Sequence, residues 1–310
     1  MIAGASHGAE EIPAMRDIDE TNITAAVVEA FHGTPDLRLK AIMTSLVGHL
    51  HDFVREVELT TDEWTRAIEY LTRTGQSCTT KRQEFILLSD VLGISMLVDA
   101  VNHRMPAGTT ETTVLGPFYV QNPPELPPGY DVSRGFKGEP LFVEGFVLSA
   151  TSEAIADAIV DIWQADSEGF YDVQRSELAG SALRGRFRTD REGRFHFRSI
   201  MPTSYLVPED GTVGEMLRAT ARQAYRPAHL HFLIAAEGHQ TLVTHLFVDG
   251  DPYLNNDAVF AVKESLIRDF TREEPGPAPD GTTMDHPWRK LTSTFRLKCA
   301  VEENAAPQAA

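Results

Sequence analysis

Apolar residues recur at helical spacing through the first third of the chain. They form two stripes, one of Ile23, Val27, Val28 and Phe31, and one of Ile42, Leu46, Leu50, Phe53 and Val54. Side chains three or four residues apart lie on one face of an α-helix. Two further helices are expected at Asp62–Arg73 and Arg82–Val101. The pattern predicts a helical N-terminal domain over residues 1–105.

Beyond Pro106 glycine and proline become frequent, and short runs are rich in β-branched and aromatic residues. Strands are expected at Leu141–Leu148, Ile155–Trp163, Gly185–Thr189, Arg194–Ser199, His229–Ala235 and Thr241–Val248. Short, regularly spaced strands are typical of a β-sandwich. We therefore expect an α+β chain with an antiparallel β-sandwich domain over residues 106–300. Pro123–Pro128 is predicted to be an extended connector, Glu273–Thr283 a loop, and residues 301–310 a flexible tail.

Charge and cysteine content narrow the class of protein. The 45 acidic and 28 basic residues give a formal charge of −17, which opposes binding to nucleic acid and to anionic lipid surfaces. Cys78 and Cys299 are too few for a disulfide framework or a zinc finger. No segment has about 20 apolar residues, and no signal-peptide pattern begins the chain. We expect a cytoplasmic protein with neither nucleic acid nor membrane as a partner.

The first chemical signal is the pair His229 and His231, which stand in one predicted strand. Alternate residues of a strand project to the same face, so the two imidazoles can hold one metal ion. The spacing alone equally fits a structural pair, or a zinc or copper site.

Two tyrosines at strand exits add to this signal. Tyr171 follows Gly169-Phe170, and Tyr205 follows Pro202-Thr203-Ser204. Side chains on loops held by a rigid scaffold are good candidates for a functional site. Each tyrosine alone also fits a packed ring with a hydrogen-bonded hydroxyl.

Five spaced motifs carry a family resemblance. They are TVLGPFY at residues 113–119, DIWQAD at 161–166, GFY at 169–171, PTSY at 202–205 and RPAHLH at 226–231. In this order they resemble the intradiol ring-cleaving dioxygenases. The helical first third resembles the dimer-forming domain of the catechol- and hydroxyquinol-cleaving members. The resemblance implies a homodimer, and a bound lipid in the helical domain is a further expected partner.

The resemblance implies that Tyr171, Tyr205, His229 and His231 are ligands of Fe(III), with Tyr205 and His231 as the axial pair and water or hydroxide as the fifth ligand. A phenol of pKa about 10 ionises at neutral pH only beside a strong cation. The implied mechanism transfers the two protons of a substrate diol to the hydroxide and to Tyr205. Arg226 is then the expected electrostatic partner of the charge that develops. A structural salt bridge is the alternative role for Arg226.

The segment after the two histidines bears on the substrate. Catechol-cleaving members usually carry Thr-Thr-Gln where this chain has Val243-Thr244-His245. This segment, residues 113–118 and residues 85–90 look more like the hydroxyquinol-cleaving members. The implied reaction is cleavage of hydroxyquinol, benzene-1,2,4-triol, by O₂ to 3-hydroxy-cis,cis-muconate, the enol form of maleylacetate. Catechol and chlorocatechol remain the alternative substrates.

Six residues match the family's pocket-lining positions, with ordinary core and turn packing as the alternative: Leu87, Gly116, Pro117, Phe118, Val207 and Pro208. Asp90 and His245, also expected to contact the substrate, stand in the segments that look more like the hydroxyquinol-cleaving members. Asp90 stands in a strongly apolar helix, where an unpaired carboxylate is costly to bury. We expect Asp90 to accept a hydrogen bond from the third substrate hydroxyl. The alternative is an Asp90 that faces solvent or pairs with the backbone.

Two other functions fit parts of the pattern. A non-catalytic β-sandwich binding module could share the fold, because fold does not imply function. A zinc hydrolase could use His229 and His231, although such a site normally recruits a carboxylate or a third histidine. Protein colour and metal analysis distinguish the three.

Overall fold

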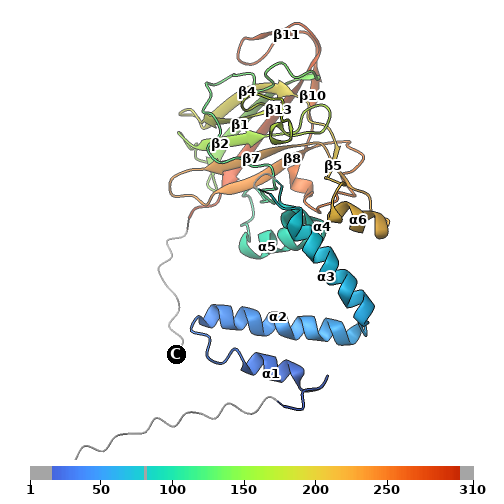
Figure 1. Ribbon diagram of the computed structural model, residues 1–310. Coiled ribbons are helices and arrows are strands. Elements are labelled where there is room, and N and C mark those ends of the chain that lie inside the picture. Colours follow the sequence, from blue (N-terminus) through green and yellow to red (C-terminus); the bar gives the residue numbers. More distant parts are fainter. Residues whose placement is uncertain (1–15, 80–81, 301–310) are drawn as a thin grey trace, which may run out of the picture. The chain divides into compact units, whose positions relative to one another are not determined.

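The computed structural model describes residues 16–79 and 82–300 (Figure 1). The chain divides into two compact units, Met1–Tyr70 and Leu71–Ala310. Residues 1–15 and the predicted tail at 301–310 lie outside the described residues. No helix in the described ranges is both long and apolar enough to cross a membrane.

The first unit contains α1 (Ile23–Glu29), α2 (Leu37–Glu56) and the start of α3 (Thr61–Gln76). Asp36 begins α2 by accepting hydrogen bonds from two backbone N–H groups of the first turn. Thr60 and Glu63 exchange hydrogen bonds and form a capping box for α3. The helices predicted here are confirmed, but no residue of α1 or α2 is buried within the described chain.

The second unit adds three helices, α4 (Glu84–Val91), α5 (Ile94–Asn102) and α6 (Thr212–Ala219). The prediction of one helix over Arg82–Val101 is wrong. The chain turns at Gly93, whose φ of 73° lies in the left-handed region that glycine tolerates. The run of apolar residues continues across this turn, so hydrophobic spacing alone gave no signal for it.

Two sheets form a sandwich in the second unit (Figure 1). One sheet has the order β10 (Thr271–Glu273), β13 (Trp288–Leu297), β1 (Pro140–Ser149), β4 (Arg194–Ile200). The other has the order β3 (Arg184–Arg188), β2 (Ile159–Trp163), β7 (His229–Ala235), β8 (Leu242–Val248), β9 (Ile267–Arg268). Two short ladders pair β5 (Tyr205–Leu206) with β6 (Tyr225–Arg226), and β11 (Gly276–Pro277) with β12 (Thr283–Met284). Single 3₁₀ turns lie at Asp172–Gln174, between β2 and β3, and at Glu264–Leu266, directly before β9.

The predicted α+β fold class is confirmed, with differences in detail. Most neighbouring strands run antiparallel, but β1 with β13 and β8 with β9 run parallel. The strand predicted at Ile155–Trp163 begins only at Ile159. The long strand β13 and helix α6 were not predicted, and the predicted loop Glu273–Thr283 contains part of the β11–β12 ladder.

The core lies between the two sheets because each strand turns alternate side chains inward. Phe232 of β7 contacts Phe295 of β13, with ring centroids 4.8 Å apart. Phe187 of β3 stacks on Phe197 of β4 at 5.2 Å. These contacts join the sheets and give β7 a rigid base. The strand that carries His229 and His231 is therefore held on both edges and on its inner face.

Candidate metal centre and adjacent pocket

The four predicted ligands converge at one point. The hydroxyl of Tyr171 lies 2.8 Å from Nε2 of His231, 3.4 Å from Nε2 of His229 and 3.2 Å from the hydroxyl of Tyr205. The two histidine Nε2 atoms are 3.1 Å apart. Donor atoms around one metal ion, each at about 2.0–2.2 Å from it, are separated by similar distances. All four side chains are buried.

Local contacts fix the tautomer of His229. Its Nδ1 lies 2.6 Å from the carbonyl oxygen of Pro227. A carbonyl only accepts, so Nδ1 carries the proton and Nε2 presents its lone pair to the centre. His231 is oriented differently, by the Trp163 ring stacked on it at 4.6 Å.

Burial sets the charge state of these groups in the absence of a cation. Burial lowers the pKa of His229 and of His231 well below the usual value; the next cause is Arg226 for His229 and His245 for His231. Both imidazoles are neutral at pH 7, as metal ligands must be. Burial raises the pKa of Tyr171 well above its usual value, and Tyr205 adds to the effect. A tyrosinate at this position therefore requires a strong positive charge beside it.

The loop that carries Tyr171 is packed tightly against the centre. Phe118 stacks on the Tyr171 ring, with centroids 4.3 Å apart. Gly169 has φ of 86°, and a Cβ there would lie 2.7 Å from Cβ of Tyr205. Only glycine permits both this backbone conformation and this approach. The Asp166 carboxylate accepts hydrogen bonds from the N–H groups of Glu168 and Phe170 and so holds the turn.

Asp251 joins the Tyr205 segment to the His229 segment. Its Oδ2 accepts hydrogen bonds from Ser204 Oγ at 2.6 Å and from the N–H of Ala228 at 3.0 Å. Each donor directly precedes a predicted ligand in the sequence. One carboxylate oxygen therefore fixes the spacing of Tyr205 and His229.

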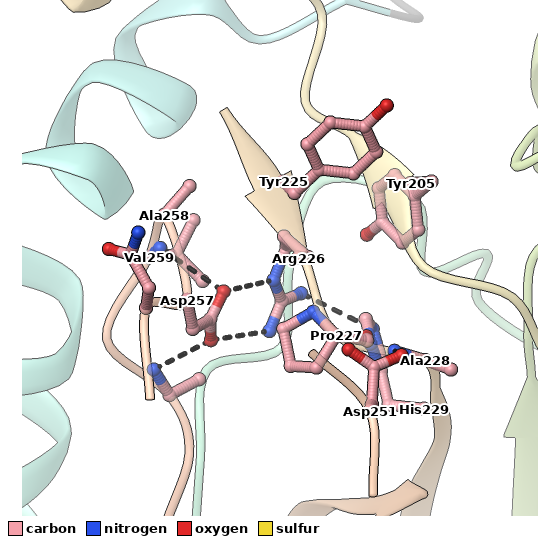
Figure 2. Close-up of polar contacts among 12 residues, drawn as sticks. Tyr205, Tyr225, Arg226, Pro227, Ala228, His229, Asp251, Asp257, Ala258 and Val259 are labelled. Atoms are coloured by element: carbon pink, nitrogen blue, oxygen red, sulfur yellow. Dashed lines mark hydrogen bonds and ion pairs between the residues drawn. The ribbon is translucent and has the colours of Figure 1, made fainter. Parts of the chain in front are cut away.

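Arg226 lies beside the centre, as the sequence predicted (Figure 2). It pairs with Tyr205 in the β5–β6 ladder, and its Nη1 is 3.3 Å from Nε2 of His229. Asp257 binds the opposite side of the guanidinium. Burial by itself lowers the pKa of Arg226, but Asp257 and the two tyrosines outweigh it, so the pKa lies above its usual value. Arg226 is a permanent buried cation at the centre.

His245 lies directly behind the two predicted ligand histidines, His229 and His231. It is the β8 partner of His231, and its ring centroid is 4.2 Å from that of His231 and 4.9 Å from that of His229. Neither ring nitrogen makes a hydrogen bond of full geometry among the described residues, although the backbone of Val114 acts as a weak partner. Nitrogen atoms of His229, His231 and His245 lie within 4.8 Å of one another, so the three could together hold a metal ion. The predicted substrate contact of His245 remains a prediction.

A pocket of about 390 Å³ opens next to the centre. Four of the predicted substrate-binding residues line it: Leu87, Pro117, Phe118 and Pro208. The remaining lining residues were not predicted: Arg82, Gln83, Glu84, Phe170, Val173, Gln174, Leu206 and Asp210. Its volume is in the range of small-molecule sites. Phe118 links the pocket to the centre, because it lines the pocket and stacks on Tyr171; none of the four predicted ligands lines the pocket itself.

The other predicted contact residues lie outside the lining of this pocket. Gly116 lies against His231, since a Cβ built on it would be 3.7 Å from Cε1 of that ring. Val207 is buried after β5. Asp90 is buried on α4; burial raises the pKa of its carboxyl group, opposed by a hydrogen bond with Ser95 and by the charge of Arg226. Its role in substrate binding stays a prediction.

Two families match the chain in succession. Residues 36–110 match the family described as "Catechol dioxygenase N terminus", and residues 115–289 match the one described as "Dioxygenase". A 6-chlorohydroxyquinol 1,2-dioxygenase from Cupriavidus pinatubonensis is 54% identical over 262 residues, which cover 84% of this chain and 95% of that protein. The chain belongs to the intradiol ring-cleavage dioxygenases.

Other members of the family agree in sequence and in structure. A hydroxyquinol 1,2-dioxygenase from a Rhizobium species is 49% identical over 256 residues, covering 82% of this chain and 87% of that protein. The crystal structure of a hydroxyquinol 1,2-dioxygenase from Pseudomonas putida superposes with a TM-score of 0.84 at 45% identity, covering 91% of this chain and 99% of that one. The predicted family resemblance is confirmed.

The centre of this intradiol dioxygenase fits a metal cofactor. Two neutral imidazoles and two phenols present their donor atoms to one point. Phenolate and imidazole are ligands of transition metals. Asp251 and Asp257 were not predicted from the sequence, because acidic residues in polar loops give no signal of what they bind. The loop after β8 carries both residues, and only the folded structure shows that this loop lies next to the centre.

Proposed function

We propose that this intradiol dioxygenase cleaves hydroxyquinol with O₂ to 3-hydroxy-cis,cis-muconate, the enol form of maleylacetate, at an Fe(III) ion. Tyr171, Tyr205, His229 and His231 are the proposed ligands. The observation that carries the proposal is that the other three donor atoms all lie 2.8–3.4 Å from the hydroxyl oxygen of Tyr171. Hard phenolate oxygens favour the trivalent state of iron, and several hydroxyquinol 1,2-dioxygenases are 43–49% identical to the chain.

The residues of the centre have separate tasks in this reaction. The diol would chelate a bound Fe(III) ion as a dianion, and the Fe(III) ion would make the ring reactive toward O₂. Tyr205 would accept one of the two diol protons, and the hydroxide expected at the metal would accept the other. Arg226 stabilises the negative charge of the bound diol and of the reacting ring. Phe118 and Leu87 hold the ring in the pocket and exclude water.

A chlorinated hydroxyquinol is a second candidate substrate. The relative that is 54% identical bears the name 6-chlorohydroxyquinol 1,2-dioxygenase. Plain catechol is less favoured, because a catechol 1,2-dioxygenase from Candida albicans is 38% identical and several catechol 1,2-dioxygenase structures are 25–29% identical, against 43–54% for the hydroxyquinol-cleaving relatives. Steady-state rates with hydroxyquinol, 6-chlorohydroxyquinol and catechol test the proposal. A higher kcat/KM for catechol than for either triol would contradict it.

The helical domain over residues 1–105 is proposed to form a homodimer, and the sandwich over 106–300 to be the catalytic domain. Within the described chain, α2 exposes five apolar side chains of its predicted stripe by 44–52%: Ile42, Leu46, Leu50, Phe53 and Val54. Such a surface is rare on a monomer and is typical of an interface. A bound lipid is a second way to cover this apolar face of α2. The proposed location of the protein is the cytoplasm. Light scattering that gave the monomer mass of 34.3 kDa at micromolar concentration would contradict the dimer.

A further inference from the structure

Asp257 lies in the turn that follows β8 and binds the side of Arg226 that faces away from the metal centre (Figure 2). Its Oδ1 accepts a hydrogen bond from Nε of Arg226 at 3.1 Å, and its Oδ2 accepts one from Nη2 at 3.4 Å. Both side chains are buried, with side-chain exposures of 5% for Arg226 and 2% for Asp257. A two-point contact of this kind fixes the plane and direction of a guanidinium.

The carboxylate of Asp257 is held in place by the backbone as well. Its Oδ1 also accepts from the N–H of Val259 at 3.3 Å, and its Oδ2 from the N–H of Ala261 at 3.0 Å. Phe260 stands between these two residues and adopts φ of 60°, which is unusual for an aromatic residue. The backbone of the turn therefore holds each carboxylate oxygen in addition to Arg226.

A second arginine anchors this turn to the helices. Arg222 donates to the carbonyl oxygens of Val91 and Ala258, and its guanidinium lies 5.1 Å from the centroid of the Phe260 ring. The Phe260 ring also lies next to Gly93. Such support is expected where a residue in an unfavourable conformation has a functional purpose.

The contact with Asp257 leaves one nitrogen of Arg226 directed at the centre. Nη1 lies 3.3 Å from Nε2 of His229, the atom that presents its lone pair to the metal. If His229 held a metal ion through this nitrogen, Nη1 would lie close to the charge of a substrate bound at that ion. The direction of Nη1 follows from the two hydrogen bonds to Asp257.

We propose that Asp257 is a positioning residue that aims Arg226 at the negative charge of the metal-bound substrate. This inference rests on the proposed function. The competing explanation is that Asp257 only neutralises a buried arginine. A neutralising role needs only a negative charge next to Arg226, which its ion pair with Asp257 supplies. Direction, in contrast, depends on the two oxygens of Asp257.

The Asp257→Asn variant separates the two explanations. Asn has nearly the same shape, but it offers one acceptor oxygen and no charge, so the guanidinium loses its fixed direction. We expect kcat per bound iron to fall about 10- to 100-fold, as is usual when a supporting partner of a site is removed. The dissociation constant of hydroxyquinol, measured without O₂ from the change in the visible spectrum, should change little. A purely neutralising Asp257 would instead give lower thermal stability and iron content with normal kcat per iron.

Glu144→Gln is the matched control. Glu144 of β1 binds Nε of Arg194 on β4 at 2.6 Å, in the sheet that carries none of the proposed ligands. This variant loses the same charge from a partly buried ion pair. It should leave kcat per iron and the anaerobic dissociation constant unchanged.

A double-mutant cycle provides the decisive comparison. In an Arg226→Gln background, Asp257→Asn should cause no further loss of kcat, because Asp257 acts through Arg226. Equal losses in both backgrounds would overturn the inference. If Asp257→Asn does not fold, Asp257→Glu keeps a carboxylate but displaces it, and normal kcat per iron in that variant would also overturn it. Failure of the proposed function itself is distinguishable, because the unmodified protein would then not turn over hydroxyquinol.

Discussion

Helix α2 and strand β7 follow equally regular apolar patterns, yet their side chains lie in opposite surroundings. Leu50 of α2 is 52% exposed in the described chain, whereas Phe232 of β7 is fully buried. The strand is covered because a second sheet packs on it, and the helix has no such cover within its own compact unit. Periodicity tells which residues share a face but not what covers that face. Activity, stability and assembly should therefore respond differently to changes in the two regions.

The largest difference is expected in catalysis. Tyr205→Phe removes the proposed proton acceptor and one phenolate ligand, so kcat should fall about 100-fold or more, with a change in the visible spectrum. Leu50 has no proposed part in the reaction, so Leu50→Ala should leave kcat per iron unchanged. Steady-state assays normalised to iron content check both. A Tyr205→Phe enzyme with normal kcat and colour would remove Tyr205 from the centre.

The next difference is in stability. Phe232→Ala opens a cavity between the two sheets and should lower the free energy of unfolding by about 3–5 kcal/mol. Leu50→Glu changes an exposed position and should alter the free energy of unfolding of the monomer by less than about 0.5 kcal/mol, while raising the monomer fraction. Denaturant unfolding and light scattering measure the two effects. Similar losses of stability would show that α2 is already covered within one chain.

A smaller difference is expected in substrate preference, between variants of two buried carboxylates on neighbouring helices. Asp90 of α4 is the predicted partner of the third substrate hydroxyl, so Asp90→Ala should lower kcat/KM for hydroxyquinol by roughly 10- to 200-fold. The loss for catechol should be much smaller, with unchanged iron content. Asp99 of α5 binds His103 and Thr112 instead, so Asp99→Ala should not change the preference between substrates. Equal losses for both substrates in Asp90→Ala would make Asp90 structural.

The smallest effect concerns the pH dependence of the metal-free protein. Burial, and then the charges of His229 and Arg226, lower the pKa of His245 well below its usual value. As the pH falls below about 6.5, the unfolded chain takes up the proton first, so stability declines. Each such histidine contributes up to about 1.4 kcal/mol per pH unit. His245→Gln should make the decline shallower in unfolding experiments between pH 7 and 5, and equal slopes would contradict this reasoning.

The sequence predicted the parts of the site that local patterns can specify. His229 and His231 alternate on a strand, and the five spaced motifs placed Tyr171 and Tyr205 with them. Long-range contacts were not predictable in this way. Strand β13 was missed because its polar residues obscure the alternation, although it pairs with β1 along nine residues. Asp251 and Asp257 stand in polar loops, and their roles depend on chain segments more than 20 residues away.

The turn at Gly93 was mispredicted for a different reason. An apolar run continues through it, so the helical pattern predicted one helix where the structure has α4 and α5. A glycine within a helical pattern is tolerated at a cost, and here it adopts the left-handed conformation that ends α4. This turn places Gly93 against Phe260 and so helps to anchor the loop of Asp257.

Metal analysis together with the visible spectrum of the purified, unmodified protein is the most direct test of the central claim. If Tyr171, Tyr205, His229 and His231 hold Fe(III), the protein contains about one iron per chain and is red to burgundy from tyrosinate-to-iron charge transfer. An iron-loaded protein without that absorption band, or a colourless protein that contains zinc, would contradict the assignment of these four ligands.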